Sequence, residues 1–200
     1  VQLSPETKRA NYFNSNGTYN GEVYNYCAGY QYQDSVIQGF AHTHFSGTGH
    51  SDLGDFLVMP IVWKVNLESS NFQSSFQHKN EKAAPGFYSV LLDDHQILAE
   101  LTASERVGFH QYSFPKNENP EVVLDFTYNI YNYDGKNVWT FIRVENDSLI
   151  TGYRITSGWA KTRTVYFAAA FSNSIREYTT ANLSEQDYKG FYRKFNQAKN

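Results

Sequence analysis

Short runs of β-branched and aromatic residues recur along this chain at intervals of roughly ten residues, and turn residues separate them. Such side chains fit the pleated, half-buried surface of a sheet. The run at 96–103 shows the pattern well, because apolar and polar side chains alternate along it as they do in a strand with one buried face. Comparable runs lie at 30–32, 36–45, 56–65, 87–92, 107–114, 122–128, 138–144, 149–156 and 164–171. Their spacing predicts a mainly β fold, an antiparallel β-sandwich, rather than a parallel α/β sheet.

The connections and the C-terminal end refine this prediction. Asp93-Asp94-His95 predicts a hairpin turn after 87–92, and Asp134-Gly135 is a second hairpin signal. Residues 66–84 are polar and are predicted to form a loop. Aromatic residues in 184–197 fall at i, i+3, i+4 and i+7, which predicts a short amphipathic C-terminal helix.

Length, charge and cysteine content exclude several classes of function. The chain has 200 residues, which suits one domain with a sizeable core. Its formal net charge of −3 gives no broad attraction for nucleic acid or for anionic lipid, so neither is an expected partner. No apolar run is long enough to cross a membrane. The single cysteine, Cys27, cannot form an internal disulfide and leaves the redox compartment open.

Residues 39–60, GFAHTHFSGTGHSDLGDFLVMP, place unusual chemistry between two apolar runs. His42 and His44 are two apart in a strand-like run, which would aim both imidazoles at one side of a sheet. A glycine-punctuated loop follows, and His50, Asp52 and Asp55 come before the next apolar run. The pattern indicates a polar loop presented by two strands.

Several chemical roles are open for this loop. His42 and His44 could ligate a metal with Asp52 and Asp55, but the spacing matches no metal signature, and histidines bonded inside a polar core are the plainer interpretation. The two aspartates could instead act as a carboxylate pair of the glycosidase kind, or they could hold the turn. A triad of Ser46 or Ser51 with His50 and Asp52 is disfavoured, because a triad is a spatial arrangement that sequence neighbours rarely form.

Exposed aromatic rings beside amides and carboxylates are typical of sugar sites. Trp63, Trp139 and Trp159 are candidates, and Trp63 and Trp139 lie inside apolar runs that predict core positions.

The block at 39–60 resembles a signature of the N-terminal domain of the glycoside hydrolase family 92 α-mannosidases. In that family a G-F-x-H-T-H-x-S-G-x-G-x-x-D-x-G-D block leads into an apolar strand that ends in M-P. Further segments resemble family motifs in the same order, over about residues 1–175: VQLSP at 1–5, GYQY at 29–32, HKNEKAAPGFY at 78–88, LTASERVGFH at 101–110, GYR at 152–154 and SGWA at 157–160.

The resemblance implies a two-part enzyme. Residues 1–175 would form the N-terminal β-sandwich, which is of a supersandwich-like kind. Residues 176–200 would form a C-terminal extension that is expected to be helical, and the catalytic (α/α)6 barrel would be absent from the chain. In the family the whole enzyme removes terminal mannose from α-mannosides, N-glycans or mannan with inversion. Calcium helps to bind the sugar and is held mainly by the barrel. The family's habit further implies a secreted or periplasmic protein.

The same resemblance suggests site residues. No catalytic residue and no metal ligand is expected in this chain. His50, Ser51, Asp52, Asp55 and Trp159 are the expected contacts to substrate. His42, His44, Gly47 and Gly49 are expected to shape the loop. The chain alone is expected to be inactive.

Two other classes of function stay open at this stage. One is a stand-alone carbohydrate-binding module, which the aromatic content favours. The other is a metal-dependent hydrolase that uses His42 and His44.

Overall fold

The computed structural model describes residues 2–45, 50–62, 72–116 and 118–179, and the chain divides into two compact units, Val1–Asn132 and Tyr133–Asn200. Each unit is described by itself. The predicted C-terminal helix at 184–197 lies outside the described residues, as does Trp63.

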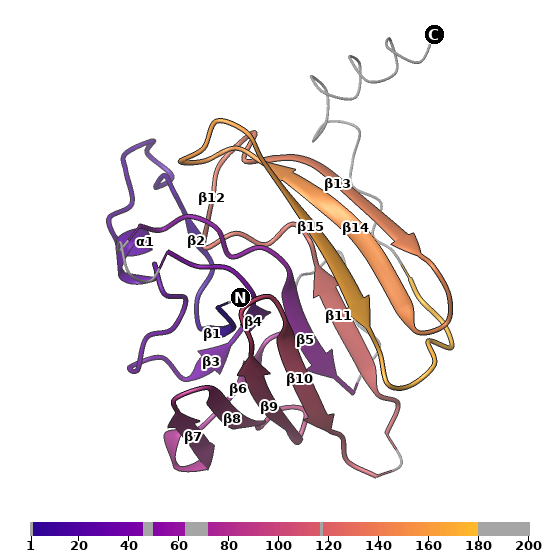
Figure 1. Cartoon of the computed structure of the whole chain (residues 1–200). Coiled ribbons are helices and arrows are strands. Elements are labelled where there is room, and N and C mark those ends of the chain that lie inside the picture. The colour runs from indigo at the N-terminus through magenta and orange to yellow at the C-terminus, as the bar shows by residue number, and fades with distance from the viewer. Residues whose placement is uncertain (1, 46–49, 63–71, 117, 180–200) are drawn as a thin grey trace, which may run out of the picture. The chain divides into compact units, whose positions relative to one another are not determined.

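In its described residues, the first unit is built from short strands and short helical turns, of which Figure 1 labels α1. Its elements are β1 (Ser4–Glu6), β2 (Ala10–Asn11), α1 (Glu22–Asn25), β3 (Val36–Ile37), β4 (Gly39–Ala41), β5 (Leu57–Ile61), β6 (Ser74–Ser75), the 3-10 helix η2 (His78–Asn80), β7 (Glu81–Ala84), β8 (Phe87–Leu92), β9 (Ile97–Ala103), β10 (Gly108–Ser113), β11 (Glu121–Asp125) and β12 (Tyr131–Asn132).

Two four-stranded antiparallel sheets dominate this unit. One has the strand order β1-β4-β5-β11 and the other the order β10-β9-β8-β7. Two small pairs accompany them, β3 with β6 and a parallel pair of β12 with β2.

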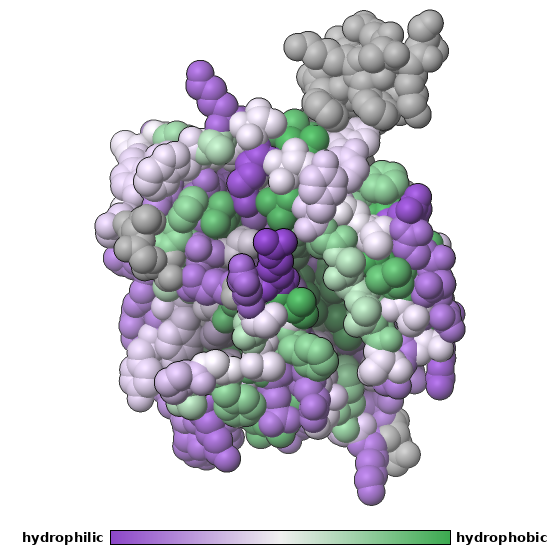
Figure 2. Space-filling view, viewed as in Figure 1, coloured by the Kyte–Doolittle hydropathy of each residue, from purple (hydrophilic) through white to green (hydrophobic). Residues whose placement is uncertain are grey.

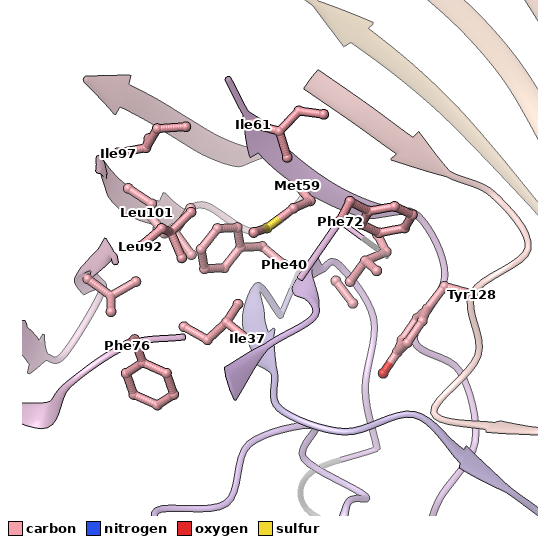
Figure 3. Close-up of a cluster of buried hydrophobic side chains, with 14 of the residues drawn as sticks. Ile37, Phe40, Met59, Ile61, Phe72, Phe76, Leu92, Ile97, Leu101 and Tyr128 are labelled. Atoms are coloured by element: carbon pink, nitrogen blue, oxygen red, sulfur yellow. The ribbon is translucent and has the colours of Figure 1, made fainter. Parts of the chain in front are cut away.

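The core contains residues of both sheets, so the two sheets form a sandwich. Phe40, Met59 and Ile61 come from the first sheet, and residues of β8 and β9 such as Leu92 and Leu101 come from the second. Figure 3 shows Phe40 close to Leu92 and Leu101, with Met59 beside it. Burying each such side chain contributes about 1.5–3 kcal/mol to folding. The predicted antiparallel β-sandwich is confirmed.

The second unit contains a three-stranded antiparallel sheet of β13 (Asn137–Val144), β14 (Leu149–Thr156) and β15 (Arg163–Ala170), in that order. Phe141, Tyr153 and Tyr166 are cross-strand neighbours, and their ring centroids are 5.5 and 5.6 Å apart. Such pairs stabilise a sheet. Large hydrophobic side chains, Tyr166 among them, stay exposed, and the face in Figure 2 shows hydrophobic residues among hydrophilic ones.

The long predicted strands and the first hairpin are confirmed, and the errors have local causes. The run at 30–32 is not a strand, and the run at 36–45 is broken after Ile37 and ends at Ala41. Part of the predicted loop at 66–84 forms β6 and β7. Asp134-Gly135 makes a turn but no hairpin, because β12 pairs with β2 whereas β13 pairs with β14.

Gly152 should be intolerant of any side chain. A Cβ atom there would lie 2.1 Å from the backbone oxygen of Phe141 and 2.7 Å from the ring of Phe167. We expect Gly152→Ala to lower the free energy of unfolding by about 1–3 kcal/mol, measured by denaturant titration. The matched control is Gly21→Ala, where a Cβ would meet nothing within 4 Å. Equal effects of the two substitutions would contradict the steric argument.

Candidate functional site

The stem of the polar loop is closed by hydrogen bonds between two segments that follow β4 and precede β5. The Gly54 amide donates to the Thr43 carbonyl at 2.8 Å, and the His42 amide donates to the Asp55 carbonyl at 3.3 Å. The Thr43 hydroxyl donates to the Asp55 carboxylate at 2.8 Å and accepts from the Asp55 amide at 3.0 Å. Asp55 is fully buried, so in this chain its carboxylate holds the stem.

The backbone between His50 and β5 adopts conformations that are rare for side-chain-bearing residues. Leu53 has φ of 76° and Phe56 has φ of 57°, on either side of Gly54 at 76°. A Cβ at Gly54 would lie 2.8 Å from the Ile130 side chain, so glycine also allows close packing there. Left-handed non-glycine residues cost about 1–3 kcal/mol each and persist only where their surroundings hold them. The packing around this stem therefore fixes the backbone at residues 53–56.

The expected sugar contacts lie close to this stem. Asp52 is 3% exposed, and its carboxylate accepts from the Leu53 amide at 2.8 Å. The Asp52 amide donates to the His50 carbonyl at 2.9 Å. His50 is half-buried and forms an isolated bridge with Phe45, whereas Ser51 is buried. The structure thus brings His50, Ser51, Asp52 and Asp55 together, and their contact with a sugar stays a prediction.

The remaining predicted residues are placed differently. Gly47 and Gly49 lie outside the described residues. Trp159 belongs to the second unit and is 61% exposed, while Trp139 is half-buried in β13. The role of Trp159 at a pocket rim stays a prediction.

His44 anchors the loop through a buried acid. Its Nε2 contacts the Glu6 carboxylate, and both side chains are fully buried. Burial by itself lowers the pKa of His44, but the hydrogen bond and charge of Glu6 outweigh it and raise that pKa above its ordinary value. The Tyr128 hydroxyl donates to the other Glu6 oxygen at 2.7 Å. Glu6 thereby joins β1 to the loop stem and to the segment after β11.

Tyr128 is itself held in place by the end of β11. Asp125 accepts the Thr127 and Tyr128 amides at 2.8 and 3.1 Å and pairs with Arg9 at 2.7 Å. Burial raises the pKa of Asp125, but the Arg9 charge and these hydrogen bonds outweigh it and lower the pKa. Figure 3 shows Tyr128 at the margin of the hydrophobic cluster. The turn at Asp125 therefore positions the phenol that reaches Glu6.

His42 contacts the facing sheet. Its Nε2 lies 2.7 Å from Nε2 of His110 in β10, and Nδ1 of His110 lies 2.6 Å from the Tyr112 hydroxyl. Burial lowers the pKa of His42 to about 4 and that of His110 to about 3, so both rings are neutral at neutral pH. His42 and His44 follow the end of β4 at Ala41, so the strand geometry that would place both on one side does not apply.

The described residues do not form a metal site. Across residues 2–45, 50–62, 72–116 and 118–179, no three His, Cys, Asp or Glu side chains are grouped so that they could hold an ion. His42 and His44 are directed to His110 and to Glu6 respectively. Within the same part of the chain, no helix is long and apolar enough to span a bilayer.

Glu6, His110 and Tyr128 are the stem partners that sequence reasoning missed. Each lies far from the loop along the chain, and none stands out in its own segment. The fully buried Glu6 is the last residue of β1. Its need for a partner becomes visible only once its burial is known.

Comparison with known proteins decides the family. A family model described as the glycosyl hydrolase family 92 N-terminal domain matches residues 1–200. The chain belongs to this family. The predicted resemblance is therefore confirmed.

Solved structures of family 92 enzymes match the fold. The α-mannosidase BT3965 from Bacteroides thetaiotaomicron, in complex with mannoimidazole, is 32% identical with a TM-score of 0.75, over 87% of this chain and 22% of that one. The inverting mannosidase BT2199 from Bacteroides thetaiotaomicron VPI-5482 is 26% identical with a TM-score of 0.53, over 78% of this chain and 18% of that one.

A curated protein from Arthroderma benhamiae is also similar to this family 92 chain. It is named an uncharacterized secreted glycosidase and is 28% identical over 112 residues, which make up 50% of this chain and 14% of that protein. The family 92 domain described here thus spans less than a quarter of the length of these relatives.

Removing the Thr43 hydroxyl should destabilise the loop stem. Thr43→Val keeps the shape of the side chain but takes a donor from the buried Asp55 carboxylate and an acceptor from the Asp55 amide. We expect the free energy of unfolding to fall by about 2 kcal/mol in denaturant titration. Thr164→Val is the control, because Thr164 is exposed and its substitution should change stability by less than about 0.5 kcal/mol. A Thr43→Val variant as stable as the control would contradict the assignment.

Proposed function

We propose that this chain is the N-terminal domain of an exo-acting, inverting α-mannosidase and lends one wall of the mannose pocket to a separate catalytic (α/α)6 domain. The observation that carries the proposal is the match of the family 92 N-terminal domain model to the whole chain. A relative that is 32% identical is an α-mannosidase in complex with mannoimidazole, and another is an inverting mannosidase. Mannosides, including the mannose termini of N-glycans or mannan, are accordingly the proposed substrates.

The loop chemistry supports a role in binding sugar rather than in cleaving it. Carboxylates and imidazoles bond sugar hydroxyls, and a segment whose backbone is already held in place, as it is at 53–56, loses little entropy when it binds. Asp52 is oriented by the Leu53 amide, and His50 is the least buried of the four loop candidates. Asp55 acts behind them, because it is fully buried against Thr43. We assign to these residues the orientation of mannose and the exclusion of water.

Calcium would be held by the separate domain in this proposal. The described residues do not fit a calcium site, since they offer no grouping of three acidic or imidazole ligands, and calcium takes six to eight oxygen ligands. No step of the reaction is therefore assigned to an ion bound by this chain. Protonation of the leaving group and activation of water are likewise assigned to the other domain.

A secreted or periplasmic location belongs to the same proposal. It is supported by the curated relative from Arthroderma benhamiae, which is named a secreted glycosidase.

The chain by itself should have no mannosidase activity. We expect no turnover of an aryl α-mannoside or of α-1,2-mannobiose in the presence of calcium, because the proposal assigns the catalytic acid and base to the separate domain. The assay follows release of the aryl group and of mannose, with an intact family 92 enzyme as the positive control. Turnover comparable to that of the intact enzyme would contradict the assignment of catalysis to the separate domain.

Binding measurements test the pocket-wall role against an independent sugar-binding module. Isothermal titration calorimetry of the chain with mannose and with mannan should show almost no heat of binding, because one wall of a pocket makes only part of the contacts. Dissociation constants of about 1 mM or tighter would instead identify a carbohydrate-binding module.

A further inference from the structure

A half-buried pair of imidazoles, His42 and His110, ties the loop stem to the opposite sheet of the sandwich. His42 follows β4 in one sheet and precedes the stem residue Thr43, whereas His110 lies in β10 of the other sheet. Their Nε2 atoms are 2.7 Å apart. Phe40 and Tyr112 surround the pair, with the Phe40 ring centroid 6.4 Å from that of each of His110 and Tyr112. The contact therefore joins the loop stem to the face of the other sheet that lines the core.

The contact between His42 and His110 depends on how many hydrogens the two Nε2 atoms carry. Two Nε2 atoms at hydrogen-bond distance must share one hydrogen, so one ring donates and the other accepts. A first added proton places a positive charge in a half-buried site where, among the described residues, the hydrogen bonds of His42 and His110 run to each other and to Tyr112 rather than to a carboxylate. A second added proton turns both Nε2 atoms into donors that point at each other. Acid thus removes the interaction that holds the pair together.

We propose that His110 is a positioning residue for the loop stem, residues 42–43 and 54–55, which it holds against the facing sheet through His42 at neutral pH and releases in acid. The consequence for mannose binding rests on the proposed function, whereas the release itself is a property of this chain. The described contacts of His110 run to His42, Phe40 and Tyr112 rather than to the residues expected to bind sugar. It therefore acts on the loop stem through His42 and the neighbouring Thr43.

The neighbouring ionisable groups do not cancel the loss of the His42–His110 contact in acid. His44, on the same segment, carries positive charge that lowers the pKa of His42 further. Glu6 is engaged by His44 and Tyr128, and Asp55 is engaged by Thr43. On β10, burial raises the pKa of Tyr112 well above its usual range, so the phenol stays neutral. No group named here supplies a negative charge bonded to the pair.

The direction of the pH effect follows from linkage. The folded-state pKa values of His42 and His110, about 4 and about 3, lie below the ordinary value of 6.5, so the opened stem binds more protons in acid. The closed stem therefore loses stability as the pH falls below about 6.5. His44 has a raised pKa, and its contribution is fully present below 6.5, so it adds no loss in this window. As the pH falls, the contact of His42 loses its contribution to the stability of the stem, whereas that of His44 is retained.

Hydrogen exchange of single amides tests the proposal on the chain as it stands. The reporter is the Gly54 amide, which donates to the Thr43 carbonyl across the stem, and the reference is the set of β9 amides. We expect the protection factor of Gly54, corrected for intrinsic exchange, to fall by about tenfold or more relative to β9 between about pH 6.5 and about pH 4.5. A Gly54 protection factor that follows β9 throughout would overturn the proposal.

His110→Gln is the informative variant. Its amide can donate to a neutral His42 and, after rotation, accept from a protonated one, so the contact should survive in acid and the selective loss at Gly54 should shrink by at least about threefold. His78→Gln is the matched control, because His78 contacts Glu81 and not the loop, and it should respond like the parent chain. An undiminished acid response in His110→Gln would reject His110 as the positioning residue.

Side-chain NMR gives a second test that needs no variant. Nitrogen chemical shifts at neutral pH should show one Nε2 of the pair protonated and the other not, and both rings should titrate together with the loss of Gly54 protection. Two rings that titrate independently near pH 6.5 would overturn the proposal. Calorimetry with mannose, by contrast, reports on the proposed function alone. The proposed function and the release of the stem in acid can therefore fail separately.

Discussion

The buried polar groups at the base of the 39–60 loop must find their partners inside the protein, and the rest of the site depends on this constraint. An unpaired buried polar group costs about 1–3 kcal/mol, and an unpaired buried charge costs more. Asp55 meets the requirement through Thr43, and His44 meets it through Glu6. Each partner also joins two segments, so satisfying the polar groups and setting the shape of the loop are one process.

The two histidines of the stem have pKa values that are shifted in opposite directions. His44 is protonated more readily than in water because Glu6 bonds it, whereas His42 is neutral and shares a hydrogen with His110. One anchor runs to β1 of its own sheet and the other to β10 of the facing sheet. A loop fixed from two directions can present His50 and Asp52 in one geometry, which is what a pocket wall requires.

Long, regular elements were predictable from the sequence, and short ones were not. Strands β8, β9, β13, β14 and β15 agree with their predicted ranges to within one residue, because alternation over six or more positions is a strong signal. Strands β2, β3, β6 and β12 have two residues each and show no period. The break between β3 and β4 depends on Gly39, whose φ of 147° suits glycine and whose missing side chain leaves room for Leu57. Such a break is decided by packing.

The sequence by itself determined that the chain is an antiparallel β-sandwich of family 92 and that His50, Ser51, Asp52 and Asp55 share one polar loop, because periodicity and ordered motifs are properties of the chain alone. Only the tertiary structure decided which of these side chains are buried and which partners they meet. Glu6, His110 and Tyr128 reach the loop from distant segments, and their chemistry follows from burial between the sheets. Protonation in the stem is therefore a consequence of the fold, since the same histidines in water would share one ordinary pKa.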